Sequence, residues 1–187
     1  MYKKHLMQKY VIAFLFIVIS SHLNAQQIEW VSMNEALDIQ QKNPKKIMLF
    51  VYAEWCKECH KMNETTFVNK DVAKYINKHF YAVHFNGEGT EKITYKGFEY
   101  TNPNYVPNRK GQNYQHFFAD ALKVKAYPTI VFFDEEGEII SPIEGFKSAT
   151  DLEIFLKMIA SNDYKNVKTF EDWEEYQKEF KPRFKVY

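Results

Sequence analysis

The sequence predicts an α/β domain with a central mixed sheet flanked by helices. Ile47–Ala53 is an unbroken apolar run of strand length, which is typical of a strand buried on both faces. Helical segments separate it from a second strand, Phe80–Phe85, and such a β–α–β crossover implies a parallel pair. Thr129–Phe133 is a third strand, and the turn at 134–137 predicts that a strand starting at Glu138 pairs back onto it.

Capping residues and apolar spacing predict the helices. Ser32–Glu35 is a capping box that opens a helix, and Lys57–Phe67 and Asn69–Lys78 have helical composition. A final helix of the domain begins at Ser148–Asp151, because apolar residues at helical spacing follow that cap. Thr169–Lys181 predicts a further short amphipathic helix.

A long irregular stretch separates the second strand from the third. Within it, apolar and polar residues alternate along Lys92–Thr101, and Lys96-Gly97 is a turn signal. This pattern predicts a small hairpin. Asn102–Gln112 is rich in Pro, Asn and Gly and predicts a loop, and Asn113–Leu122 predicts a helix.

The first 25 residues predict a cleaved secretory signal peptide. Three lysines precede the apolar run Val11–Ile19, and Ala25 stands at a suitable cleavage site. Nine apolar residues are too few to cross a hydrocarbon core of about 30 Å at about 1.5 Å per residue. An uncleaved membrane anchor is the alternative. The sequence therefore predicts a periplasmic or secreted protein.

The charge of the chain argues against nucleic-acid binding. The whole chain has a formal net charge of +1. The first 25 residues contain three lysines and no acid, so residues 26–187 carry −2. Nucleic-acid binding needs a basic surface, which this balance does not provide.

Cys56 and Cys59 are the two cysteines of the chain, and the stretch WCKECH that contains them has three chemical interpretations. Cys-x-x-Cys is a thiol–disulfide redox pair, whereas Cys-x-x-Cys-His is the attachment signal for a c-type haem, with His60 as axial ligand. A zinc site would combine the cysteines with His79 and His84, at a spacing longer than zinc fingers use. Haem-c domains are generally helical, which does not suit the predicted sheet.

The redox interpretation needs the fewest assumptions. A cysteine at the start of a helix lies among unpaired N–H groups at the positive end of the helix dipole, and both stabilise a thiolate. Thiol pKa values in such motifs fall to about 3.5–7.5, from about 8.5 for a free cysteine. A second thiol one helical turn later can resolve a mixed disulfide. A purely structural disulfide across two intervening residues would close almost no loop, so it would stabilise the folded state very little.

Two segments resemble the thioredoxin superfamily. Phe50–Phe67 (FVYAEWCKECHKMNETTF) is similar to its active-site segment, especially in the periplasmic C-terminal domain of the membrane electron transporter DsbD. Val124–Asp134 (VKAYPTIVFFD) resembles the family's second signature, which runs into a strand. The resemblance implies a thioredoxin fold over residues 26–160, an insertion at about 86–125 before the cis-proline loop, and a C-terminal helical extension over 161–187.

The resemblance also implies roles for residues of the motifs. Cys56 resembles the exposed attacking cysteine and Cys59 the buried resolving one, with Trp55 flanking the disulfide. Pro128 resembles the cis-proline that faces the cysteines, so that the backbone of Tyr127 is left to pair with an extended substrate. The other residues that we assign to support of the active site are Lys57, Glu58 and Thr129.

Three positions depart from the pattern of thioredoxin. Phe50 stands where many thioredoxins place a buried acid, six residues before the first cysteine, so the proton acceptor for the resolving thiol is not indicated. Lys57-Glu58 replaces Gly-Pro, so the reduction potential does not follow by analogy. His60 could tune the thiolate electrostatically, and an exposed helix histidine is the alternative.

The insertion leads into the cis-proline loop and is therefore placed to border the active-site face. Tyr114 is a candidate for a partner surface, and so are His60 near the motif and His116 on the predicted helix. Tyr100, Tyr105 and Phe117 could extend that surface. The alternative is that the aromatic residues pack the insertion onto the core.

We therefore predict an exported thiol–disulfide oxidoreductase that reduces protein disulfides through a Cys-x-x-Cys cycle, without cofactor or metal. Its expected partners are protein thiol or disulfide substrates and a membrane electron-transfer protein of DsbD type. The alternative function is a thioredoxin-fold binding or chaperone-like module that holds a partner protein with the insertion.

Overall fold

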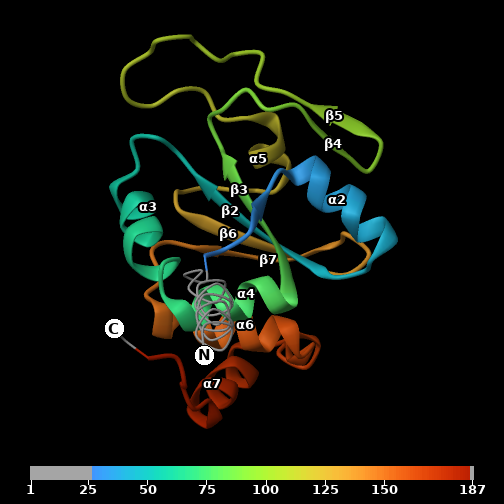
Figure 1. Cartoon of the computed structure of the whole chain (residues 1–187), viewed down its shortest axis with the longest axis vertical. Coiled ribbons are helices and arrows are strands. Elements are labelled where there is room, and N and C mark those ends of the chain that lie inside the picture. The colour runs from blue at the N-terminus through green and yellow to red at the C-terminus, as the bar shows by residue number, and fades with distance from the viewer. Residues whose placement is uncertain (1–26, 186–187) are drawn as a thin grey trace, which may run out of the picture.

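A five-stranded mixed sheet lies at the centre of residues 27–185, which are the residues that this computed structural model describes (Figure 1). The predicted signal peptide, residues 1–25, lies outside them. The strands follow one another across the sheet in the order β1-β3-β2-β6-β7. They are β1 Trp30–Val31, β2 Lys46–Tyr52, β3 Phe80–Asn86, β6 Thr129–Phe133 and β7 Ile139–Glu144.

The pairing of the strands confirms the predicted topology. β2 and β3 run parallel, from Lys46 opposite Phe80 to Tyr52 opposite Asn86. β6 pairs with β2 and β7 with β6, both antiparallel, so the predicted hairpin is present. The sequence analysis did not predict β1, a strand of two residues that pairs in parallel with β3.

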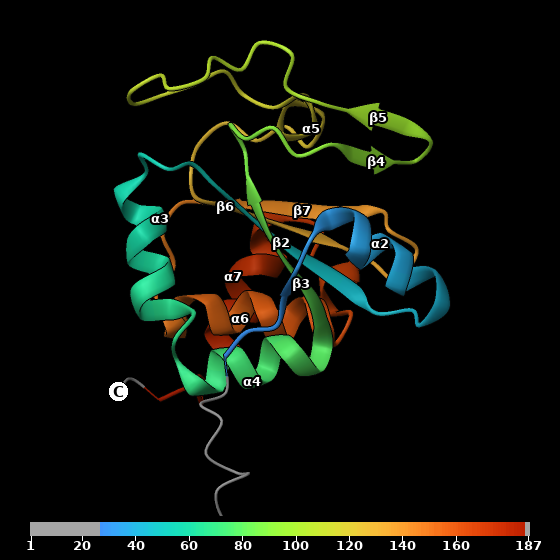
Figure 2. The ribbon, with the colours of Figure 1, turned by 45° about the horizontal axis from the view of Figure 1, so that its top comes forward.

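Helices cover both faces of the sheet, giving three layers (Figure 2). They are α2 Met33–Lys42, α3 Lys57–Lys61, α4 Lys70–His79, α5 Phe117–Ala121, α6 Ala149–Ala160 and α7 Phe170–Glu179. Successive residues of a strand point to opposite faces. Met48 and Phe50 of β2 therefore lie in the core with α4 and α6, whereas Leu49 and Val51 lie in the core with α2 and α5. None of the helices in residues 27–185 is both long and apolar enough to cross a bilayer.

Side-chain caps fix where three of these helices begin. Ser32 Oγ accepts the Glu35 N–H at 3.2 Å before α2. Ser148 Oγ accepts the Asp151 N–H at 3.2 Å, and the Asp151 carboxylate accepts the Ser148 N–H in return. The same reciprocal cap, built on Thr169, opens α7. The predicted starts of these helices are confirmed.

Two predicted helices differ in form from the expectation. The segment Lys57–Phe67 is helical, but after α3 it continues as one π-helical turn over Met62–Thr66. The helix predicted over Asn113–Leu122 begins only at Phe117. Its start is set by His116, whose Nδ1 accepts the Phe118 N–H at 3.0 Å and so caps α5.

The inserted stretch contains the predicted hairpin. β4 (Ile93–Tyr95) and β5 (Phe98–Tyr100) pair antiparallel. Lys96 and Gly97 join them with φ values of 51° and 77°, the left-handed conformations that a tight two-residue hairpin turn requires. Asn34 of α2 holds the hairpin: its Oδ1 accepts the Thr94 N–H at 2.8 Å.

The segment after α7 is bound to the rest of the molecule through Glu153 of α6. The Glu153 side chain is fully buried. Its carboxylate accepts the backbone N–H groups of Arg183 and Phe184, each at 2.8 Å, and forms an ion pair with Lys157. A buried carboxylate needs such partners, because burying an unpaired charge is costly.

Candidate active site

The two cysteines lie where β2 ends and α3 begins. Cys56 and Cys59 form a disulfide, with their Cα atoms 5.2 Å apart. Cys56 caps the amino end of α3, because its Sγ accepts the Cys59 N–H at 3.1 Å. The Cys56 N–H donates to Ala53 O at 3.0 Å, which closes the turn after the strand. The pair therefore has the strand–cysteine–helix arrangement that the sequence predicts.

Cys56 is less accessible than the resemblance implies. It is 3% exposed, and Cys59 is fully buried. The expectation of an exposed attacking cysteine is therefore wrong for the disulfide form, because the Cys56 sulfur is bonded to Cys59 and lies against the first turn of α3. Cys56 is nevertheless the one of the two that reaches the surface.

The loop before β6 contains a cis peptide bond between Tyr127 and Pro128, as the resemblance implies. Pro128 is buried, and its carbonyl oxygen accepts the Gly145 N–H at 2.8 Å. Thr129 is also buried and donates its hydroxyl to Ala126 O at 2.7 Å, across the proline. Hydrogen bonds on both sides therefore hold this loop.

The rings of Trp55 and Tyr127 bring the two loops together. Their centroids are 6.0 Å apart in an edge-to-face arrangement. Because Trp55 precedes Cys56 and Tyr127 precedes Pro128, this contact places the disulfide beside the cis-proline loop. Burial raises the pKa of Tyr127 above its usual range, so its phenol stays neutral and can donate a hydrogen bond.

Glu88 is a residue of the site that the sequence analysis did not identify. It is 8% exposed, and its Oε2 accepts both the Trp55 Nε1–H at 2.9 Å and the Asn113 N–H at 2.7 Å. Glu88 lies at the start of the insertion, so its carboxylate joins the insertion to the indole beside the disulfide. Gly87 and Gly89 flank it, and glycines at a strand end are a sequence signal of close backbone approach.

Lys57, Glu58 and His60 are exposed residues of α3. Glu58 lies 3.8 Å from Lys61, with both side chains 55% exposed, and a surface ion pair of this kind contributes little stability. The Nε2 atom of His60 lies 2.7 Å from Glu54 O, so the ring is bonded to the turn before the motif. Whether these three residues tune the disulfide remains a prediction.

His116 is buried, so the prediction that it lies on a partner surface is wrong. It has no exposed surface. Its Nε2 atom lies 2.7 Å from Glu91 O, and its Nδ1 caps α5. Both ring nitrogens are therefore engaged within the insertion itself.

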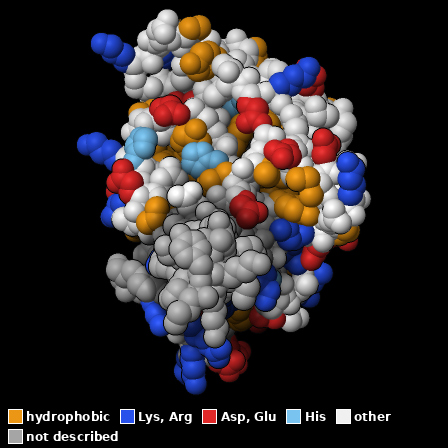
Figure 3. Space-filling model, in the orientation of Figure 1, with side chains coloured by type: hydrophobic (Ala, Val, Ile, Leu, Met, Phe, Trp, Pro, Cys, Tyr) orange, Lys and Arg blue, Asp and Glu red, His pale blue; other side chains and the backbone are white. Residues whose placement is uncertain are grey.

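The other aromatic residues of the insertion divide between the surface and the core. Tyr114 is 50% exposed, and Tyr105 and Phe117 are also exposed. Tyr100 instead packs on Phe118, with ring centroids 5.4 Å apart. Figure 3 shows apolar side chains gathered at the top of the molecule, over the loop that follows β5.

An aromatic cluster surrounds Phe50, the position where many thioredoxins place a buried acid. The Phe50 ring lies 4.8 Å from that of Phe67 and 5.3 Å from that of His84, between centroids. Tyr52 also contacts His84, at 4.2 Å. Burial lowers the pKa of His84 to about 4, so its ring is neutral at pH 7. Its Nε2 atom lies 3.3 Å from Asn63 Oδ1.

His84 should make the protein less stable in acid. Its pKa is about 4 in the folded state and about 6.5 in an unfolded chain, so between these values the unfolded chain binds the proton more tightly. The contribution of His84 is complete above about pH 6.5 and is lost as the pH falls to about 4. We expect a loss of about 1–2 kcal/mol in unfolding free energy, after screening by solvent.

Urea unfolding at pH 7 and at pH 4.5 measures this effect. His84→Phe should show a smaller difference between the two pH values than the wild type, because the variant lacks the titrating ring. An equal pH dependence in the two proteins would contradict the assignment to His84.

The four residues of the zinc hypothesis do not converge. The sulfurs of Cys56 and Cys59 are bonded to each other. His79 ends α4, whereas His84 lies five residues further along β3, which is about 16 Å for an extended chain. Within residues 27–185, no group of three or more His, Cys, Asp or Glu side chains is arranged to hold a metal ion.

Comparison with known proteins supports the redox interpretation of the cysteine pair. The chain matches a family model described as a thioredoxin-like domain over residues 33–160. It is 30% identical over 118 residues to the thiol:disulfide interchange protein DsbD of Pectobacterium atrosepticum, an alignment that covers 62% of this chain and 17% of that protein. The chain thus spans less than a fifth of the length of this relative.

Two solved structures share the fold. A thioredoxin-fold protein from Helicobacter pylori is similar with a TM-score of 0.55 and 22% identity, over 73% of this chain and 82% of that one. A DsbH oxidoreductase is similar with a TM-score of 0.52 and 20% identity, over 79% and 90%. The predicted fold class, a mixed sheet flanked by helices in the thioredoxin arrangement, is confirmed.

Proposed function

The chain belongs to the thioredoxin-like family, and from this premise we propose that it is a thiol–disulfide oxidoreductase that reduces protein disulfides outside the cytoplasm. The observation that carries the proposal is the Cys56–Cys59 disulfide at the start of α3, beside the loop of cis-Pro128. Thiol–disulfide exchange needs an attacking thiolate and a second thiol within its reach, and this pair provides both.

The proposed reaction begins with the reduced dithiol. The Cys56 thiolate attacks one sulfur of the substrate disulfide and displaces the other as a thiolate, which leaves a mixed disulfide. Cys59 then loses its proton and attacks the Cys56 sulfur, which re-forms the Cys56–Cys59 bond and releases the second substrate thiol. Two electrons pass to the substrate, so a donor must return two electrons to the protein.

Cys56 is the proposed nucleophile because of its place at the helix start. The N–H of Cys59 points at its Sγ, and the amino end of a helix favours a negative charge. A thiolate there is stabilised, which makes it available at neutral pH. Cys59 is fully buried and can act only after Cys56 has reacted.

The compartment and the electron donor rest on other observations. Export is supported by the predicted signal peptide in residues 1–25, followed by a cysteine pair that can cycle in an oxidising space. The donor that we propose is a membrane electron-transfer protein of DsbD type, since a protein of that name contains a segment similar to this chain.

The reduction potential of the pair tests the direction of electron flow. A pair that passes electrons to other protein disulfides needs a potential about as low as that of thioredoxin. We expect a value of about −270 mV, measured by alkylating free thiols after equilibration with dithiothreitol buffers. Cys59→Ser should show no two-electron transition. A value near about −120 mV would indicate an oxidant instead.

A second candidate function is a module that binds a partner protein without turnover. The exposed Tyr105, Tyr114 and Phe117 of the insertion favour it, because exposed aromatic residues often mark contact surfaces. The two functions differ in whether the cysteines are needed, which a cysteine variant can decide.

A further inference from the structure

One short segment of the insertion, residues 113–115, touches the active-site surface at two points. The Asn113 N–H donates to Glu88 Oε2 at 2.7 Å, the same oxygen that holds the Trp55 indole. Two residues later, Gln115 Oε1 accepts the Tyr127 hydroxyl at 3.0 Å. The insertion is therefore attached to both aromatic residues that flank the disulfide and the cis-proline.

Tyr127 is held on three sides. Its ring lies so close to Gly87 that a Cβ atom there would be 2.5 Å from the Tyr127 Cε1 atom. Trp55 contacts the ring edge to face. The Gln115 amide oxygen binds the hydroxyl group at the far end of the side chain. Of these three contacts only the third is a directional hydrogen bond, so it sets where the hydroxyl group lies.

The orientation of the Gln115 amide is determined by its other partners. Its Nε2 group donates to Asp120 Oδ1 at 2.6 Å and to Val124 O at 3.0 Å. Turning the amide over would bring its oxygen towards these two acceptors, which is unfavourable. The oxygen of Gln115 therefore faces Tyr127, where it can only accept.

We propose that Gln115 is a positioning residue, which holds Tyr127 so that the backbone before cis-Pro128 is ready to pair with an extended protein substrate. The inference rests on the proposed function and adds to it a residue of the insertion that affects substrate affinity. A small disulfide needs only the Cys56 sulfur, so its reduction does not depend on Gln115. A polypeptide that pairs with the backbone of Tyr127 does depend on it.

Gln115→Leu tests the proposal, because it removes the amide and keeps a side chain of similar size. With insulin as the protein disulfide substrate, we expect KM to rise about three- to tenfold, the range of one net hydrogen bond, while kcat is unchanged. With the small disulfide 5,5′-dithiobis(2-nitrobenzoate), the rate should be unchanged. Tyr127→Phe should have the same effect on insulin, and the double variant should be no worse than either single variant.

Gln177→Leu is the matched control, since Gln177 is exposed on α7. It should leave both reactions unchanged. An unchanged KM for insulin in folded Gln115→Leu would overturn the proposal, and so would an equal loss with both substrates. If Gln115→Leu does not fold, Tyr127→Phe decides by the same two criteria. If the wild type reduces neither disulfide, the proposed function itself fails, which is a different result.

Discussion

Replacing Cys56 by serine is expected to abolish the reduction of insulin disulfides, lowering kcat/KM by at least about 10³-fold. The thiolate is the nucleophile of disulfide exchange, and a serine hydroxyl at the same helix start is not ionised at neutral pH. The fold should survive, because Ser is close to Cys in size and can also accept the hydrogen bond that caps α3.

Cys59→Ser is the matched variant, and it should fail in a different way. It keeps the Cys56 nucleophile and lacks the resolving thiol, so it should accumulate a mixed disulfide between Cys56 and the substrate. Mass spectrometry without reductant measures this adduct. If Cys56→Ser accumulated the mixed disulfide and Cys59→Ser did not, Cys59 would be the nucleophile and Cys56 the resolving cysteine.

The Cys56→Ser variant also distinguishes the two candidate functions. If the chain is a binding module, Cys56→Ser should hold its partner as the wild type does, and disulfide reduction should be slow in both proteins. Turnover by the wild type that disappears in Cys56→Ser identifies the oxidoreductase that we propose.

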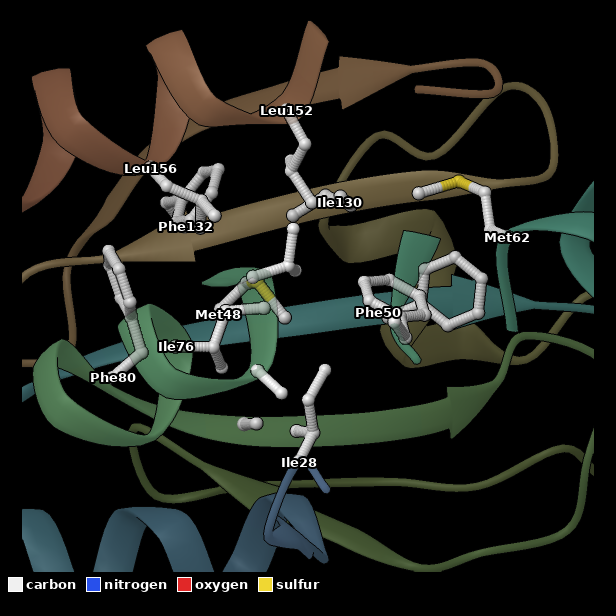
Figure 4. Close-up of a cluster of buried hydrophobic side chains, with 14 of the residues drawn as sticks. Ile28, Met48, Phe50, Met62, Ile76, Phe80, Ile130, Phe132, Leu152 and Leu156 are labelled. Carbon is white, nitrogen blue, oxygen red and sulfur yellow. The ribbon is translucent and has the colours of Figure 1, made fainter. Parts of the chain in front are cut away.

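Phe50→Ala should cause the largest loss of stability, about 3–5 kcal/mol in unfolding free energy. Phe50 is fully buried in the core between the sheet and the helices α4 and α6 (Figure 4). Its ring contacts those of Trp30 on β1, Tyr52 on the same strand and Phe67 in the turn after the π-helical segment. Truncation to alanine leaves a cavity that these rings cannot fill without breaking their own contacts.

Urea unfolding of wild type and variant at pH 7 measures the loss. Phe170→Ala is the matched control, because the same substitution at a residue that is 69% exposed should change stability by less than about 0.5 kcal/mol. A loss below about 1 kcal/mol for Phe50→Ala would show that the cluster is not a tightly packed core.

Several features could be predicted because each depends on residues close together in the chain. The cap of Ser148 and Asp151 starts α6 by bonds across one helical turn. The turn at Lys96-Gly97 sets the β4–β5 hairpin in the same way. The resemblance added cis-Pro128, which no local pattern indicates. The two cysteines could be paired with each other because the chain has no others.

The errors arose where contacts between distant segments decide the structure. Asn113–Leu122 has helical composition, but its first residues make hydrogen bonds to Glu88 and Tyr127, and α5 therefore begins later. His116 was expected on the surface, but its ring caps α5 and contacts Glu91. A periodic pattern carries no information on such contacts.

The class of fold and the proposed redox chemistry could be inferred from the sequence, because a cysteine pair after a buried strand depends only on local order. The residues that surround the pair depend on the tertiary structure. Glu88 and Gln115 reach the active-site surface only because the insertion folds back onto it, through bonds between residues up to 33 positions apart. Loop closure over such distances depends on the whole domain, which is why local patterns did not indicate these contacts.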